Sequence, residues 1–215
     1  MNVLGVLLGV AIAAEQQMSA NPFKLVLAGA LAATFAESIS MGAVAYTSTL
    51  ARRDHYLAEE EREKREMREV PDLERSEVRN VLRGWGFEGP ELEDVLERIV
   101  SKPKAWLEFM MAYELNLTPI DVGQPRKSAL LVGFAAIFGS AIPLIPFLFF
   151  PTAIVSGMVA SVLVAAVSLF LIGWYKARTT VGRPTRSGLQ MVVIGITSAF
   201  AGFLIAYAIG AGPIG

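Results

Sequence analysis

Carboxylate and thioether side chains recur at helical spacing in one charged segment of this chain. Two Glu-x-x-Glu pairs and one Met-Met-x-x-Glu motif follow one another within about fifty residues. Residues three or four apart share a face of a helix, so each motif would present its side chains together. The pattern indicates a segment that collects divalent metal ions. Its candidate ligands are Glu63, Glu66, Glu74, Glu77, Met110, Met111 and Glu114.

The first glutamates of this segment also have a plainer interpretation. Five of them crowd one stretch of helix, at Glu59, Glu60, Glu61, Glu63 and Glu66. Like charges at this spacing repel by a few tenths of a kcal/mol per pair, and the basic residues between them offset part of that repulsion. Taken alone, the run is more typical of a solvated, mixed-charge helix face. Methionine, likewise, is most often a filler of apolar cores.

The residue types restrict which metal could bind. The chain has no cysteine, which excludes thiolate sites. It has one histidine, His55, which excludes multi-histidine sites within one chain. Carboxylate oxygens with a thioether nearby favour a softer ion than Mg²⁺ or Ca²⁺. The donor set fits Fe²⁺ as the bound ion, with Mn²⁺, Co²⁺ or Zn²⁺ as neighbours that the same site could take.

Charge is confined to the middle of the chain. All but five of the 19 Lys and Arg residues, and all but two of the 20 Asp and Glu residues, lie between Ala51 and Lys127. The remainder is apolar over long runs, and the chain as a whole is 53% hydrophobic, which is the signature of membrane spans. The net charge of −1 offers no basic field to hold a nucleic acid.

The apolar runs predict five transmembrane helices. The first, Met1 to Ala14, is truncated, because about 21 Å of helix is short of a hydrocarbon core of roughly 30 Å. We therefore expect an all-α membrane protein with transmembrane helices 1–2 at residues 1–50, a helical metal-binding domain at 51–125 and helices 3–5 at 126–215. The other predicted spans are Phe23–Leu50, Ser128–Phe150, Ala153–Tyr175 and Gly188–Ile209.

Prolines divide the charged segment into short helices. The second span should continue to about Glu69, where Pro71 breaks it. No stretch alternates with a period of two residues, so we expect no strands. Three further helices are predicted, over Asp72–Arg83, Glu91–Val100 and Lys104–Leu117.

One carboxylate lies within the second span. Glu37 is four residues from Met41, so both side chains share a helix face. A carboxylate in lipid is costly and by default functional, so we predict that Glu37 and Met41 line a transport pathway. A helix-packing face rich in small residues is the alternative. The basic residues at the span edges place the charged segment in the cytoplasm by the positive-inside rule.

Taken together, these residues resemble the vacuolar iron transporter family. The resemblance rests on Glu37 with Ser40-Met41, on Arg53-Asp54 before the Glu-rich helix, on the helices ending Met110-Met111-x-x-Glu114, and on Gly139-x-x-x-Pro143-x-x-Pro146. It covers nearly the whole chain, and the order and spacing of the motifs carry it rather than any one of them.

The resemblance implies a function. Members of that family are five-span homodimers that exchange cytosolic Fe²⁺ for protons through a cytoplasmic metal-binding domain. Carried over to this chain, the domain's two Glu pairs, Met pair and final Glu fall on the seven candidate ligands above, and the pathway methionine falls on Met41. The partners implied are divalent metal ions, protons, the lipid bilayer and a second copy of the chain. The chain departs from the family in one respect, since its first span starts Met1-Asn2-Val3-Leu4-Gly5 without the family's Asp-Gly pair.

The residues alone also allow two other classes of function. A membrane-anchored metal sensor or buffer would bind metal without transport and would be insensitive to changes at Glu37 and Met41. A ferritin-like di-iron oxidase is weaker, because such sites usually use Glu-x-x-His and His55 lies outside that spacing. We do not expect an enzyme. No organelle signal is visible, which favours a prokaryotic cell membrane as the location.

Overall fold

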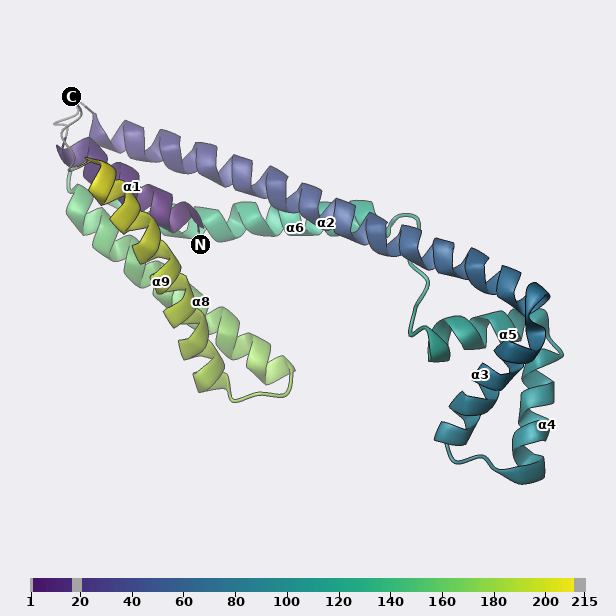
Figure 1. Cartoon of the computed structure of the whole chain (residues 1–215). Helices are drawn as coiled ribbons and strands as arrows, with labels where there is room; N and C mark the ends of the chain where they lie inside the picture. Colours follow the sequence, from purple (N-terminus) through teal and green to yellow (C-terminus); the bar gives the residue numbers. More distant parts are fainter. Residues whose placement is uncertain (1, 17–20, 211–215) are drawn as a thin grey trace. The chain divides into compact units, whose positions relative to one another are not determined.

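The computed structural model describes residues 2–16 and 21–210, and every regular element in these ranges is helical (Figure 1). The predicted all-α fold class is confirmed for that part of the chain. The elements are α1 (Asn2–Gln16), α2 (Pro22–Glu69), α3 (Pro71–Gly84), α4 (Gly89–Val100), α5 (Pro103–Phe109), η1 (Met110–Glu114), α6 (Gln124–Ala141), η2 (Ile142–Leu144), α7 (Ile145–Phe149), α8 (Ile154–Thr179) and α9 (Pro184–Gly210).

Four helical stretches among the described residues are long and apolar enough to cross a membrane. They are α2, the combined stretch Gln124–Phe149, α8 and the α9 segment Pro184–Ile205. The apolar part of α1, Val3–Ala14, is shorter than these. The structure therefore supports a multi-pass membrane protein, while the count of five spans stays a prediction.

Helix α2 is the long element that runs through both compact units of the chain (Figure 1). Its 48 residues correspond to about 72 Å of helix, far more than a bilayer core requires. Its first half is apolar and its second half charged, as predicted, and it ends at Glu69 before Pro71. The first unit comprises Met1–Ala43 and Leu130–Gly215, and the second comprises Val44–Ala129.

In the first unit, α8 and α9 form a helical hairpin, and α1 lies against it (Figure 1). The core is built from the side chains of α1 with those of α2, α7, α8 and α9. Two glycines meet where α1 packs on α9: a Cβ on Gly5 would lie in van der Waals contact with the Cα of Gly202, at 3.5 Å. The short helix α1 is thus part of the packed core of this unit.

Prolines interrupt the third predicted span. Between α6 and α7 the chain tightens into the 3₁₀ turn η2, which contains Pro143, and Pro146 follows in α7. The carbonyl of Pro143 accepts a hydrogen bond from the hydroxyl of Ser161 on α8. The expected irregular half of this span is therefore present, and a neighbouring helix satisfies one of its carbonyls, as apolar surroundings require.

The second unit has its own apolar core. Two ion pairs, Arg75 with Glu97 and Arg79 with Glu93, join α3 to α4 at their exposed faces. Gly86 takes a positive φ of 94° in the turn between these helices, a conformation that favours glycine. The core residues are Val78, Leu82, Leu92, Leu96, Val100, Trp106, Phe109 and Met110.

The last predicted helix of the charged segment is wrong in its second half. An α-helix was expected over Lys104–Leu117, but α5 ends at Phe109 and continues as the π-helical turn η1. The amide of Leu115 bonds the carbonyl of Met110 at 3.0 Å, five residues back instead of four. One additional residue is accommodated in the turn that holds both methionines and Glu114.

Candidate metal-binding site

Two glutamates of the second unit are buried although they lie in the charged segment of the sequence. Glu63 of α2 is 1% exposed and Glu74 of α3 is 3% exposed. Pro71 makes this possible, because it starts α3 immediately after α2 ends and turns the chain back. The first turn of α3 also favours the acidic residues Asp72 and Glu74, whose charge complements the helix dipole.

The two buried carboxyl groups act on each other. Burial, followed by a hydrogen bond with Glu74 and the charges of Glu74, Glu114 and Glu66, together raise the pKa of Glu63 to about 8. One oxygen on each of Glu63 and Glu74, Oε1 and Oε2 respectively, has no hydrogen-bond partner among the described residues. Two buried carboxylates this close must share a proton or be compensated by a cation.

Three further carboxylates complete the cluster. Burial, followed by the charges of Glu74 and Glu66, raises the pKa of Glu77. The pKa of Glu114 is raised by partial burial of its carboxyl group, then by the charges of Glu77 and Glu74, although the residue as a whole is exposed. Each of these carboxylates is thus close enough to influence several of the others, and the set is Glu63, Glu66, Glu74, Glu77 and Glu114. We refer to these five as the carboxylate cluster.

The methionines of the candidate set differ in their surroundings. Both are buried, Met110 at 0% and Met111 at 2% exposure. Met110 belongs to the apolar core with Val78 and Leu82, which is the filler role. Met111 is not part of that core, so its thioether is the better candidate ligand of the two. The wide π turn separates their surroundings in this way.

One cation lies at the edge of the carboxylate cluster. Arg62 forms an ion pair of 2.8 Å with Glu59, and its Nε lies 3.7 Å from Glu66. Its charge lowers the pKa of Glu77 and Glu114, against the other influences on them. The sequence pattern presented Arg62 only as a general offset to the glutamates. Its contact with the candidate ligand Glu66 follows from their i,i+4 spacing within α2, which the sequence alone could have indicated.

The carboxylate cluster does not form a complete metal-coordination sphere in this structure. Over the residues that the structure describes, no group of three or more His, Asp or Glu side chains is arranged to hold a metal ion. The carboxylates form an electrostatic cluster around the buried Glu63 and Glu74, and small side-chain movements would have to bring further oxygens onto an ion. Flexible glutamate side chains suit ions that accept oxygen ligands.

The two residues that were predicted to line a transport pathway share a cavity in the first unit. This cavity has a volume of about 220 Å³, and Glu37 and Met41 line it together with Gly139, Ser140 and Pro143. The hydroxyl of Ser140 donates a hydrogen bond of 3.2 Å to Oε2 of Glu37. Glu37 therefore has a polar hydrogen-bond partner, which is what a carboxylate in an apolar helix requires.

Ser140 and Ser168, the other polar residue that lines this cavity, were missed by the sequence analysis. Ser140 directly follows Gly139 in the Gly-x-x-x-Pro stretch that was singled out, so a serine beside a predicted helix break was the available signal. No signal in the sequence pointed to Ser168.

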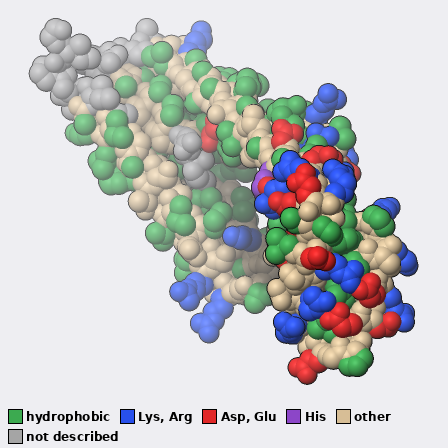
Figure 2. Space-filling view, turned by 45° about the vertical axis from the view of Figure 1, so that its right-hand side comes forward, with side chains coloured by type: hydrophobic (Ala, Val, Ile, Leu, Met, Phe, Trp, Pro, Cys, Tyr) green, Lys and Arg blue, Asp and Glu red, His purple; other side chains and the backbone are tan. Residues whose placement is uncertain are grey.

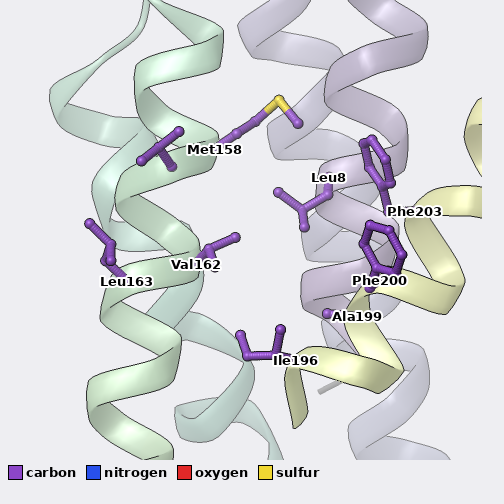
Figure 3. A pocket seen from close by; sticks show the side chains of 9 residues that line it. Leu8, Met158, Val162, Leu163, Ile196, Ala199, Phe200 and Phe203 are labelled. Carbon is purple, nitrogen blue, oxygen red and sulfur yellow. The ribbon is translucent and has the colours of Figure 1, made fainter. Parts of the chain in front are cut away.

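A larger cavity of about 360 Å³ in the same unit is unsuited to an ion. Its lining comes from α1, α8 and α9 and is apolar throughout (Figure 3). Leu8, Met158 and Phe203 project toward it from three helices. Because no side chain there offers an oxygen or a charge, this cavity suits acyl chains or packing and not a metal path.

Comparisons with known proteins agree over nearly the whole chain. The family model described as "VIT family" matches residues 1–207. Vacuolar iron transporter 2 of rice (Oryza sativa subsp. japonica) is 38% identical over 199 residues, which cover 93% of this chain and 80% of the relative. Vacuolar iron transporter 1 of Arabidopsis thaliana is 35% identical over 182 residues, 85% of this chain and 72% of the relative. Protein CCC1 of Saccharomyces cerevisiae is 26% identical over 195 residues, 87% of this chain and 60% of the relative.

Proposed function

The chain belongs to the VIT family, and from this membership we propose that it transports iron across a membrane. Members of the family are transporters and not enzymes. Several relatives carry iron transport in their names, and the apolar helices of this chain suit a membrane protein. Fe²⁺ is therefore the proposed substrate, with Mn²⁺, Co²⁺ and Zn²⁺ as further ions that the same ligands could accept.

The observation that carries the proposal at the residue scale is the burial of Glu63 beside Glu74. Burying one carboxylate is costly, and burying two together is more so unless a proton or a cation compensates their charge. A chain that keeps such a pair outside its apolar core gains a site with a need for a cation. In our proposal this domain, residues 51–125, lies in the cytoplasm and collects the metal through the carboxylate cluster and Met111, with Met110 beside it.

The second step of the proposal is passage across the membrane at Glu37 and Met41. A carboxylate and a thioether on one cavity wall provide a hard and a soft donor for Fe²⁺. A carboxylate must release its proton before it binds a metal, so reprotonation from the other side would release the ion. This coupling makes proton exchange the natural driving force, with helices from residues 1–50 and 126–215 forming the path.

A homodimer completes the proposal. The described helices of the first unit leave many large apolar side chains exposed, among them Phe35, Ile39 and Phe138. Lipid covers such side chains in a membrane, and a second copy of the chain could cover those on α2. The alternative of a membrane-anchored sensor or buffer is not favoured, because the curated relatives are named as transporters.

Transport in proteoliposomes tests the proposal. The purified chain is reconstituted with a metal-sensitive dye inside, and Fe²⁺ uptake is followed with and without an imposed pH gradient. We expect uptake well above that of empty liposomes, acceleration by the gradient and a loss of at least tenfold in Glu37→Gln. Glu88 is exposed and lies outside the carboxylate cluster. The Glu88→Gln variant is therefore the matched control and should transport Fe²⁺ at the wild-type rate.

The proposal is wrong if the wild-type chain takes up Fe²⁺ no faster than empty liposomes. If uptake is the same with and without the pH gradient, only the proton-exchange part of the proposal is contradicted. A Glu37→Gln variant as fast as wild type would remove Glu37 from the pathway, and the family-level function would then need a different route.

A further inference from the structure

The α8–α9 hairpin carries basic residues at one end, and the part of the sequence that forms it contains no acidic residue. From Val122 to Gly215 the sequence contains no Asp or Glu. Its basic residues are Arg126, Lys127, Lys176, Arg178, Arg183 and Arg186. Figure 2 shows blue side chains without red ones at the end of the apolar helices, whereas red and blue are mixed over the charged segment.

Close packing fixes the two helix ends that carry this charge. A Cβ added to Gly173 of α8 would lie 2.7 Å from the backbone oxygen of Ser187, and one added to Gly188 of α9 would lie 2.7 Å from the ring of Phe170. Each glycine is therefore needed for the approach of the other helix. The loop between α8 and α9 is held by backbone contact at its base, so its basic side chains project from a rigid support.

Three of these cations surround a cavity. Lys176, Arg183 and Arg186 line a space of about 410 Å³. The polar side chains of Thr180, Ser187 and Gln190 complete its lining. Within the first unit, no carboxylate of a described side chain lies within 4.0 Å of any of the three cations. The cavity thus combines several hydrogen-bond donors with unpaired positive charge, which is the chemistry of a phosphate site.

Aromatic residues place this cavity at the depth of lipid headgroups. Trp174 and Tyr175 occupy the last turns of α8, and Tyr175 is 66% exposed. Such residues collect where a transmembrane helix meets the membrane–water interface. The guanidinium of Arg178 lies 5.0 Å from the centre of the Trp174 ring, so this cation is used for a different contact.

We propose that the cavity at the end of α8 and α9 binds the phosphate of an anionic phospholipid. Arg183 and Arg186 offer planar guanidinium groups for the phosphate oxygens, and Lys176 adds a third positive charge. Basic pockets between helices at the membrane surface are suited to such headgroups. The acyl chains would lie along the exposed apolar faces of α8 and α9, where Leu171 and Leu189 are more than half exposed.

The proposal does not depend on iron transport, because neither the carboxylate cluster nor Glu37 is part of this cavity. A simpler role for the basic residues is orientation in the membrane by the positive-inside rule. That role ends once the protein is folded and inserted. It predicts no preference of the purified protein for anionic over zwitterionic lipid, so lipid binding separates the two interpretations.

The test is lipid-dependent thermal stability of the purified full chain in a neutral detergent. Phosphatidylglycerol and phosphatidylcholine with the same acyl chains are titrated separately, and soluble glycerol phosphate and inorganic phosphate are titrated at the same concentrations. We expect phosphatidylglycerol to raise the melting temperature, and phosphatidylcholine and the two soluble phosphates to leave it nearly unchanged. Native mass spectrometry at low temperature counts the retained lipids independently of unfolding.

Two double variants make the test specific. Arg183→Gln/Arg186→Gln removes two cations from the cavity, and Arg126→Gln/Lys127→Gln removes the same charge at the start of α6. The first should lose at least half of the lipid-induced shift and most of the retained phosphatidylglycerol, while the second behaves as wild type. Equal shifts in all three proteins, or equal effects of the two lipids, would overturn the proposal. An equal shift by inorganic phosphate would overturn its assignment to a lipid.

Discussion

The chemistry of the proposed metal site begins with single carboxyl groups whose surroundings differ. Glu63 and Glu74 are fully buried, Glu66 and Glu77 are half-buried, and Glu114 is exposed. The buried pair provides the need for a cation, and the outer three provide oxygens that can move toward one. The same residue type thus serves two purposes, which the spacing of glutamates along the sequence cannot distinguish.

The raised pKa of Glu63 makes the stability of the metal-free protein depend on pH. An ordinary glutamate titrates near 4.5, whereas folding raises the pKa of Glu63 to about 8. The folded state thus favours the protonated form, so the stabilisation is complete below pH 4.5 and is lost as the pH rises through 8. In Glu63→Gln this loss is absent, because the amide does not ionise.

Thermal unfolding of the metal-free chain measures this difference. Between pH 6 and pH 9 we expect the melting temperature of the wild type to fall by more than that of Glu63→Gln. In a unit of this size, each kcal/mol lost from the free energy of unfolding lowers the melting temperature by about 4–8 °C. The exposed Glu88→Gln should follow the wild type. Parallel pH profiles for wild type and Glu63→Gln would show that Glu63 is not held protonated in the folded state.

At the scale of elements, the π-helical turn η1 separates the surroundings of the two methionines. Met110 packs in the core of α3, α4 and α5, and Met111 lies outside it. A continuous α-helix was expected here, and the difference arises from a change in the backbone hydrogen bond of Leu115. Composition and periodicity carry no information on such a change, so the turn could not be predicted from the sequence.

Matched leucine variants test this assignment. Because leucine has nearly the volume of methionine, Met110→Leu and Met111→Leu should each cost less than about 1.5 kcal/mol of stability. Calorimetric titration with Co²⁺, which is stable in air, should show a loss of affinity of about tenfold in Met111→Leu and little change in Met110→Leu. The reverse order, or no loss in either variant, would assign both thioethers to packing alone.

The α8–α9 hairpin offers a second prediction at this scale. Alanine normally stabilises a helix relative to glycine by about 1 kcal/mol. In Gly173→Ala the new Cβ would meet the backbone of Ser187 at 2.7 Å and that of Gly188 at 2.9 Å, which cannot move without separating the helices. We expect Gly173→Ala to lower the free energy of unfolding by about 1–3 kcal/mol.

The control for this hairpin is a glycine with free space around it. No heavy atom would lie within 4 Å of a Cβ at Gly139 of α6, so Gly139→Ala should be neutral or slightly stabilising. Denaturant or thermal unfolding in detergent compares the two. A Gly173→Ala variant as stable as the Gly139→Ala variant would mean that the hairpin adapts at no cost.

For the whole molecule, the sequence predicted the elements better than their contacts. The starts of α3, α4 and α5 follow from Pro71, Pro90 and Pro103, and the membrane stretches follow from apolar runs, because both effects are local. The hydrogen bond from Ser140 to Glu37 joins residues 103 positions apart. The burial of Glu63 likewise brings it beside Glu74 of α3 and Glu114 of η1, which local sequence patterns do not show, and a solvated helix face was therefore the more usual interpretation.

The central claim is that the carboxylate cluster around Glu63 and Glu74 binds a divalent metal ion. Anomalous X-ray diffraction from crystals of the full chain soaked in Mn²⁺ or Co²⁺ tests it most directly. We predict an anomalous peak about 2.0–2.3 Å from carboxylate oxygens of both Glu63 and Glu74, with at least one oxygen from Glu66, Glu77 or Glu114 completing the site. The same soak of Glu63→Gln/Glu74→Gln crystals should lose that peak. Peaks found only elsewhere in the wild type, or an unchanged peak in the double variant, would contradict the account.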